Sequence, residues 1–104
     1  MTLEELLAVE ALELAGVEVG TSSDGTVTWS RGGRPFATLS GDGTVAEFAL
    51  DPAVGAAAAR TPDVTVSGRG PGWVAFAPDV LDDHGADRAV AWFASAYRRL
   101  EPRN

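Results

Sequence analysis

The residue types that could do chemistry are few in this chain, and they gather just before its last helical stretch. His84 is the only histidine, there is no cysteine, and three aspartates lie close to the histidine: Asp82, Asp83 and Asp87. An imidazole beside carboxylates could act as a general base or contribute to a metal site. Aspartates at this position also cap a helix and complement its dipole. Adjacent positions do not place ligands on one face, so the sequence favours the capping role.

Other catalytic patterns are missing. No Gly-x-Ser-x-Gly stretch occurs, and His84 is the sole imidazole that could activate a serine. The glycine-rich run 68–72 could surround an anion with backbone donors and the Arg69 guanidinium. It joins two expected strands and opens no helix, so it is neither a dinucleotide-binding nor a P-loop fingerprint. The sequence therefore assigns no catalytic, cofactor-binding or metal-binding residue, and it favours a non-enzymatic protein.

Two tryptophans and an arginine form the candidate binding surface. Trp73 alternates with Val74 and Phe76 along one expected strand, so we expect it on the other face of the sheet from Phe76. Trp92 falls outside the main apolar stripe of the last helix. Large exposed aromatic side chains are typical of binding surfaces, whereas a second core layer or a dimer interface would bury them. Together with Arg69, Trp73 and Trp92 are the candidate surface residues.

The charge of the chain argues against nucleic acid as a partner. Acidic residues outnumber basic ones fifteen to eight, which gives a formal net charge of −7. A nucleic-acid-binding protein neutralises phosphates with a basic patch. One alternative remains, in which Arg31, Arg34 and Arg69 on hairpin tips contact nucleic acid. Contact with a membrane is not expected, because no apolar run approaches the roughly 18 residues of a spanning helix.

The first fifteen residues carry four glutamates and no basic residue. A secretory signal has the opposite pattern, with a positive start and an uninterrupted apolar run. We therefore expect a cytoplasmic protein.

The pattern of apolar residues and turn signals predicts one α+β domain over residues 1–104. Thr2 and Glu5 have the spacing of a capping box, and Asp51 followed by Pro52 opens a second helix. Gly32-Gly33 is a two-residue hairpin signal. The expected elements are helices over 2–15, 52–60 and 86–100, and strands over 17–21, 26–31, 34–40, 44–50, 64–66 and 73–77.

This order is helix, three or four strands, helix, two strands, helix. Strands that are grouped between helices and joined by tight hairpins predict an antiparallel sheet of five to six strands with helices packed on it. We expect Phe76 in the core, facing the apolar stripe of the last helix at Val90, Phe93 and Tyr97.

Several stretches of the chain resemble the small bacterial YjbR/MmcQ-like domain. They are Gly16–Ser22, Arg34–Leu39, Gly72–Val74 and Ala96–Arg98. The resemblance covers most of the chain and implies an α+β domain with much the same order of elements. That family is often described as DNA-binding, which the acidity of this chain does not support.

A second, weaker resemblance is to the fungal-luciferase-like family of small domains. The matching stretches are Gly32–Arg34, Gly41–Gly43, Gly72–Phe76 and Asp87–Tyr97. The family carries histidines on the second hairpin strand and before the Gly-Trp strand. Here those regions read Thr38-Leu39-Ser40 and Thr65-Val66-Ser67. Any chemistry that rests on the histidines does not transfer to this chain.

The sequence thus favours a small, acidic, non-enzymatic domain that binds a protein partner or a small ligand, with a homodimer as a further expectation. One alternative is an enzyme or metal-binding protein that uses Asp82, Asp83, His84 and Asp87. The other is nucleic-acid binding of the YjbR-like kind.

Overall fold

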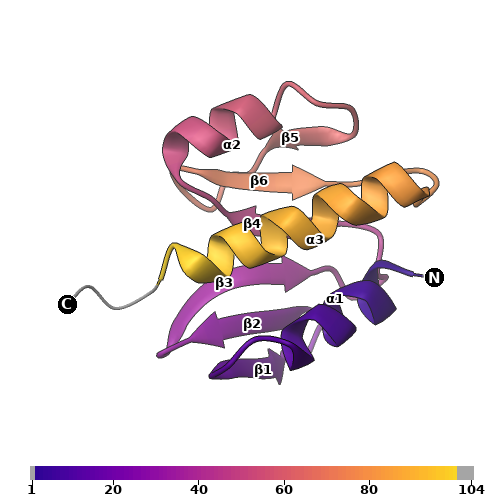
Figure 1. Ribbon diagram of the computed structural model, residues 1–104. Helices are drawn as coiled ribbons and strands as arrows, with labels where there is room; N and C mark the ends of the chain where they lie inside the picture. Colours follow the sequence, from indigo (N-terminus) through magenta and orange to yellow (C-terminus); the bar gives the residue numbers. More distant parts are fainter. Residues whose placement is uncertain (1, 101–104) are drawn as a thin grey trace.

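The computed structural model describes residues 2–100, in which one six-stranded antiparallel sheet carries three helices on a single face (Figure 1). The strand order is β1-β2-β3-β4-β6-β5, so the last two strands join the sheet in reversed sequence. The elements are α1 (Leu3–Leu12), β1 (Val17–Thr21), β2 (Val27–Arg31), β3 (Arg34–Leu39), β4 (Ala46–Ala49), α2 (Pro52–Ala58), β5 (Val64–Val66), β6 (Trp73–Phe76) and α3 (Asp83–Arg98). The predicted α+β class with an antiparallel sheet is confirmed.

Short polar turns fix the register of the first four strands. Gly32 and Gly33 both have positive φ, at 59° and 77°, which a two-residue hairpin requires. The other two turns are closed by aspartates, since Asp24 and Asp42 accept hydrogen bonds from neighbouring hydroxyl and backbone groups. These bonds stabilise the charged carboxylates and lower the pKa of each aspartate to about 2.

Two helix boundaries differ from the sequence prediction. Helix α1 carries the predicted capping box but ends at Leu12, and the chain turns before Gly16, whose φ is 74°. Helix α3 begins at Asp83, three residues before the predicted start, because Asp82 caps it by accepting a hydrogen bond from Gly85 N at 2.7 Å. Gly85 conceals this start in the sequence, yet it packs against Phe76 in the structure.

The core lies between the sheet and α3. Phe36, Phe48, Phe76 and Phe93 are fully buried there, and Phe93 meets Phe36 edge-on with ring centroids 5.1 Å apart. Val74 and Phe76 both point into this core, as predicted. No helix among the described residues is long and apolar enough to cross a membrane.

Helix α2 closes the other end of the same layer over β5 and β6. A Cβ atom on Gly55 would lie 2.9 Å from the backbone oxygen of Gly72, so only glycine allows this approach. Asp51 accepts a hydrogen bond from Ala53 N and Pro52 occupies the first turn, as the sequence predicts. The second face of the sheet carries none of these helices, and every other strand residue points to it.

Candidate functional site

The structure separates the three residues of the predicted binding surface into two layers. Arg69 and Trp73 lie together on the face of the sheet without helices, with the guanidinium carbon 5.8 Å from the centroid of the indole. Trp92 lies on α3, where it is half-buried against the ring of Phe76 at 5.4 Å. Trp92 therefore serves the core layer, and only Arg69 and Trp73 share a surface.

A carboxylate that the sequence analysis missed organises the uncovered face. Glu47 on β4 accepts hydrogen bonds from Thr38 at 3.1 Å, from Arg69 at 2.8 Å and from Ser67. Partial burial would raise the pKa of Glu47, but the hydrogen bonds from Ser67, Arg69 and Thr38 outweigh it and lower the pKa. The sequence signal that could have identified Glu47 is its position as a single acidic residue between Ala46 and Phe48, two buried strand residues. All donors are internal, so the network ties β3, β4 and the β5–β6 loop together.

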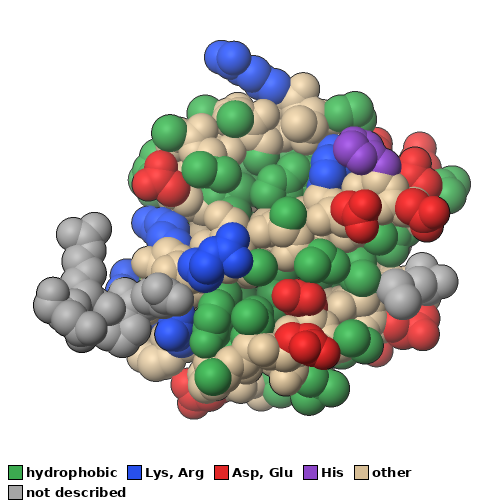
Figure 2. Space-filling model, in the orientation of Figure 1, with side chains coloured by type: hydrophobic (Ala, Val, Ile, Leu, Met, Phe, Trp, Pro, Cys, Tyr) green, Lys and Arg blue, Asp and Glu red, His purple; other side chains and the backbone are tan. Residues whose placement is uncertain are grey.

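The charged side chains divide between the two ends of α3. Figure 2 shows acidic side chains and the single histidine near the N-terminal end of α3, and basic side chains near its C-terminal end. Arg31 lies over the ring of Tyr97 at 4.0 Å and donates to Tyr97 O at 3.2 Å. Arg34 lies opposite Arg31 in the register of the β2–β3 hairpin. These two arginines thus lie at the basic end, and Arg31 is held against α3.

The acidic residues that precede His84 have a structural role at the start of helix α3. Asp82 is the N-cap of α3 and Asp83 lies in its first turn. Within residues 2–100, no three histidine, cysteine, aspartate or glutamate side chains gather closely enough to hold a metal ion. The geometry adds no support to the alternative that this group is a catalytic or metal site.

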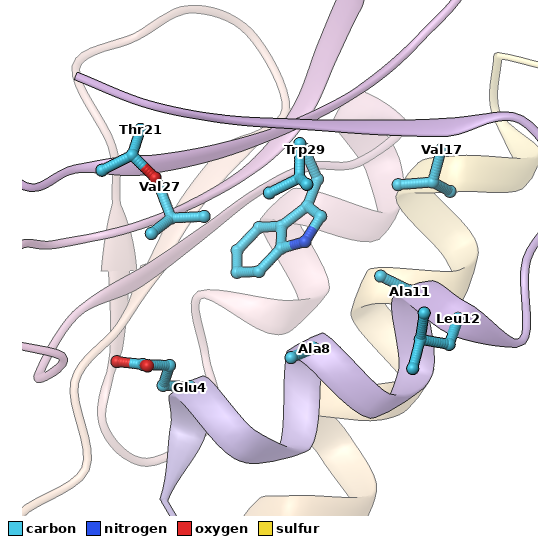
Figure 3. Close-up of a pocket in the computed structure, with 9 residues that line it drawn as sticks. Glu4, Ala8, Ala11, Leu12, Val17, Thr21, Val27 and Trp29 are labelled. Carbon is cyan, nitrogen blue, oxygen red and sulfur yellow. The ribbon is translucent and has the colours of Figure 1, made fainter.

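An apolar groove lies between α1 and the first two strands (Figure 3). Its volume is about 560 Å³, within the range of about 300–1,000 Å³ that is usual for small-molecule sites. Three elements line it, and nearly all of the side chains are apolar. The lining residues are Glu4, Ala8, Ala11 and Leu12 from α1, Val17, Val19 and Thr21 from β1, and Val27 and Trp29 from β2.

The groove exists because α1 packs mainly on α3 and not on the strands below it. Leu3 and Leu7 carry this contact and are buried in the common core. Toward β1 and β2 the helix presents Ala8 and Ala11, whose single methyl groups cannot reach the valines of the strands (Figure 3). Small side chains on the helix therefore leave a gap that larger ones would fill.

Trp29 forms the floor of the groove and brings one polar group to it. The side chain is only 3% exposed, and its ring packs edge-on against Phe93 with centroids 5.5 Å apart. The indole nitrogen is directed toward α1 (Figure 3) and donates no hydrogen bond to the residues that the structure describes. The only fully buried polar side-chain atom without a partner in residues 2–100 is Nε of Arg88, so the indole N–H keeps access to the groove.

The two ends of the groove differ in polarity. Glu4 and Thr21 lie at one end, beyond Val27, whereas Ala11, Leu12 and Val17 form the other end (Figure 3). Leu12 is 88% exposed and Val19 65% exposed, so the rim is apolar as well. The groove thus has apolar walls, one hydrogen-bond donor on its floor and an acidic group at one end.

Comparison with known proteins gives no match to this chain among family models, curated proteins or solved structures. The resemblance to the YjbR/MmcQ-like and fungal-luciferase-like families stays a prediction from the sequence. The groove is therefore the feature of the molecule that bears on its function.

Proposed function

We propose that this domain is a non-enzymatic binding module whose α1–β1 groove holds a small, mainly apolar molecule. The observation that carries the proposal is the combination of an unfilled apolar groove with the unpaired indole N–H of Trp29 on its floor. Protein interiors are close-packed, so a gap of this size next to the core is a departure from ordinary packing. Small-molecule sites are typically apolar with a few placed polar groups.

The groove also suggests the chemistry of its occupant. An apolar body would cover Val17, Val19 and Val27, and an acceptor atom would take the hydrogen bond that Trp29 has to offer. Glu4 at the polar end favours a neutral or positively charged head group and disfavours a carboxylate, since like charges repel. No serine, cysteine or histidine lines this site, which fits binding without turnover.

The proposal is tested with the neutral dye N-phenylnaphthylamine, whose fluorescence rises in apolar surroundings. We expect the native chain to bind it, and Ala8→Phe to weaken binding at least about tenfold, or about 1.4 kcal/mol, because the new ring fills the groove. Val9→Phe is the matched control: Val9 is the next residue on α1, is 56% exposed and does not line the groove.

Two outcomes would contradict the proposal. One is a native chain that leaves the dye fluorescence unchanged at millimolar dye. The other is an Ala8→Phe variant that binds the dye as tightly as Val9→Phe does.

A further inference from the structure

We infer that β1 pairs with β1 of a second copy of this chain, antiparallel and across a two-fold axis at Val19. This pairing is separate from the proposed ligand groove, because it uses the unpaired backbone groups of the edge strand β1. The two sheets would join into one continuous sheet, and the partner would cover the apolar rim at Val19 and Leu12.

The free edge of β1 presents a row of unpaired backbone groups. Ser22 N donates to Thr26 O at 2.9 Å, which makes this pair a hydrogen-bonded one in the β1–β2 ladder. Hydrogen-bonded and non-hydrogen-bonded pairs alternate along an antiparallel ladder, so Val17, Val19 and Thr21 direct their N–H and C=O groups away from β2. No other segment within residues 2–100 bonds to them.

The usual devices that protect an edge strand are missing from β1. Natural sheets shield their edges with proline, lysine, bulges or very short strands. The other edge of this sheet, β5, has only three residues, whereas β1 has five and contains no proline or basic residue. Its one charged residue is Glu18, which points to the uncovered face and leaves the groove side apolar.

The sequence of β1 is self-complementary in this register. With the axis at Val19, the two Val19 residues face each other, and Val17 faces Thr21 of the partner subunit. Each outward N–H then meets an outward carbonyl. Glu18 lies opposite Gly20 of the partner subunit, which avoids a like-charge pair and offers no side chain to clash with. A two-fold axis at Glu18 would instead place two carboxylates opposite each other, so charge disfavours that register.

The exposed apolar side chains lie where this partner would cover them. Val19 is 65% exposed and Leu12 on the adjacent helix is 88% exposed, although both are large and apolar. Helix α1 carries apolar residues on all sides, a pattern that is typical of a helix covered on more than one face. A strand from another protein would satisfy the same backbone groups, but the self-complementary register favours a second copy.

Sedimentation equilibrium of the full chain tests the inference. We expect a dimer at high micromolar concentration. Val19→Pro should give a folded monomer, because the N–H that proline removes is unpaired within the monomer. Val66→Pro is the matched control and should stay dimeric. Val66 is 75% exposed on the other edge strand, and its N–H faces outward because Ser67 N bonds Trp73 O at 2.9 Å.

If Val19→Pro fails to fold, single-cysteine variants decide the matter, since the chain has no cysteine of its own. Facing hydrogen-bonded residues have Cα atoms about 5.5 Å apart, which a disulfide can bridge. Mild oxidation should join two Val19→Cys chains by a disulfide and leave Val66→Cys without a covalent cross-link. A native chain that is monomeric at every concentration, or a Val66→Cys variant that cross-links as readily as Val19→Cys, would overturn the inference.

Discussion

Helix α3 fills its contact with the sheet, whereas α1 leaves a groove over β1 and β2. The two helices lie side by side on the same face (Figure 1), so the difference comes from their side chains. Helix α3 presents Phe93 and Tyr97 to the strands, and both are buried. Helix α1 presents Ala8 and Ala11 to β1 and β2, whereas its Leu3 and Leu7 are buried in the common core.

The groove lies next to the core of this small domain without interrupting it. The aromatic contacts of Phe93 with Trp29 and Phe36 hold the central strands in place from one side. The same Trp29 then serves as the rigid floor of the groove on the other side. The stability of the core is therefore carried by α3, and the proposed binding by the neighbouring helix α1.

The largest loss of stability is expected in the layer under α3. Phe76→Ala empties a fully buried aromatic site and should cost about 3–5 kcal/mol, a large part of the total of about 5–15 kcal/mol for a small domain. Trp73→Ala on the same strand should cost clearly less, since Trp73 is half-buried on the uncovered face. Denaturant melts of both variants measure this. A Trp73→Ala variant that is the less stable of the two at every protein concentration would invert the assignment of faces.

An intermediate effect is expected at the uncovered face. Glu47→Gln removes a charged acceptor of three side-chain hydrogen bonds and should cost about 1–2 kcal/mol at neutral pH. The pKa of Glu47 in the folded protein is lower than the ordinary pKa of a glutamate, so this stability is present above the unfolded pKa and is lost as pH falls through the folded pKa. The difference in free energy of unfolding between the native chain and Glu47→Gln should therefore decrease below pH 4.5. A difference in free energy of unfolding that is constant with pH would show that the charge of Glu47 does not contribute to stability.

The smallest effect is expected at the rim of the groove. Leu12→Ala should change the stability of the monomer by less than about 0.5 kcal/mol, because the side chain is 88% exposed. Leu7→Ala on the same helix is the matched comparison and should cost about 2–5 kcal/mol, since Leu7 is fully buried. Urea melts at low protein concentration separate the two. Equal losses would mean that α1 packs through both faces in the monomer.

The fold was largely predictable because its signals are local. Gly32-Gly33 specifies a hairpin, Asp51-Pro52 starts a helix, and the alternation of Val74 and Phe76 with Trp73 sets the faces of β6. The start of α3 was not predicted because Gly85 breaks the apolar period, although a Cβ atom at this position would lie 3.1 Å from Oδ1 of the N-cap residue Asp82, which leaves little room for a side chain.

The groove could not be predicted, because it is a property of packing between elements. Ala8 and Ala11 are ordinary helix residues in the sequence, and their role appears only once α1 leans on α3. Val27 and Trp29 are two residues apart on one strand and therefore share a face, but nothing in the sequence says that the Trp29 N–H lacks a partner. Arg69 and Trp73 were found from residue type alone, whereas Glu47, which holds Arg69, was overlooked.

The central claim is that the groove over Trp29 accepts an apolar ligand, and the indole N–H signals of the three tryptophans in a nitrogen–proton correlation spectrum test it directly. On addition of N-phenylnaphthylamine, we expect the indole N–H signal of Trp29 to shift and to reach a constant position as the dye concentration rises. The signals of Trp73, on the uncovered face, and Trp92, on α3, should stay in place, and Ala8→Phe should abolish the Trp29 shift. An unmoved Trp29 signal at saturating dye, or a shift confined to Trp73, would contradict the account.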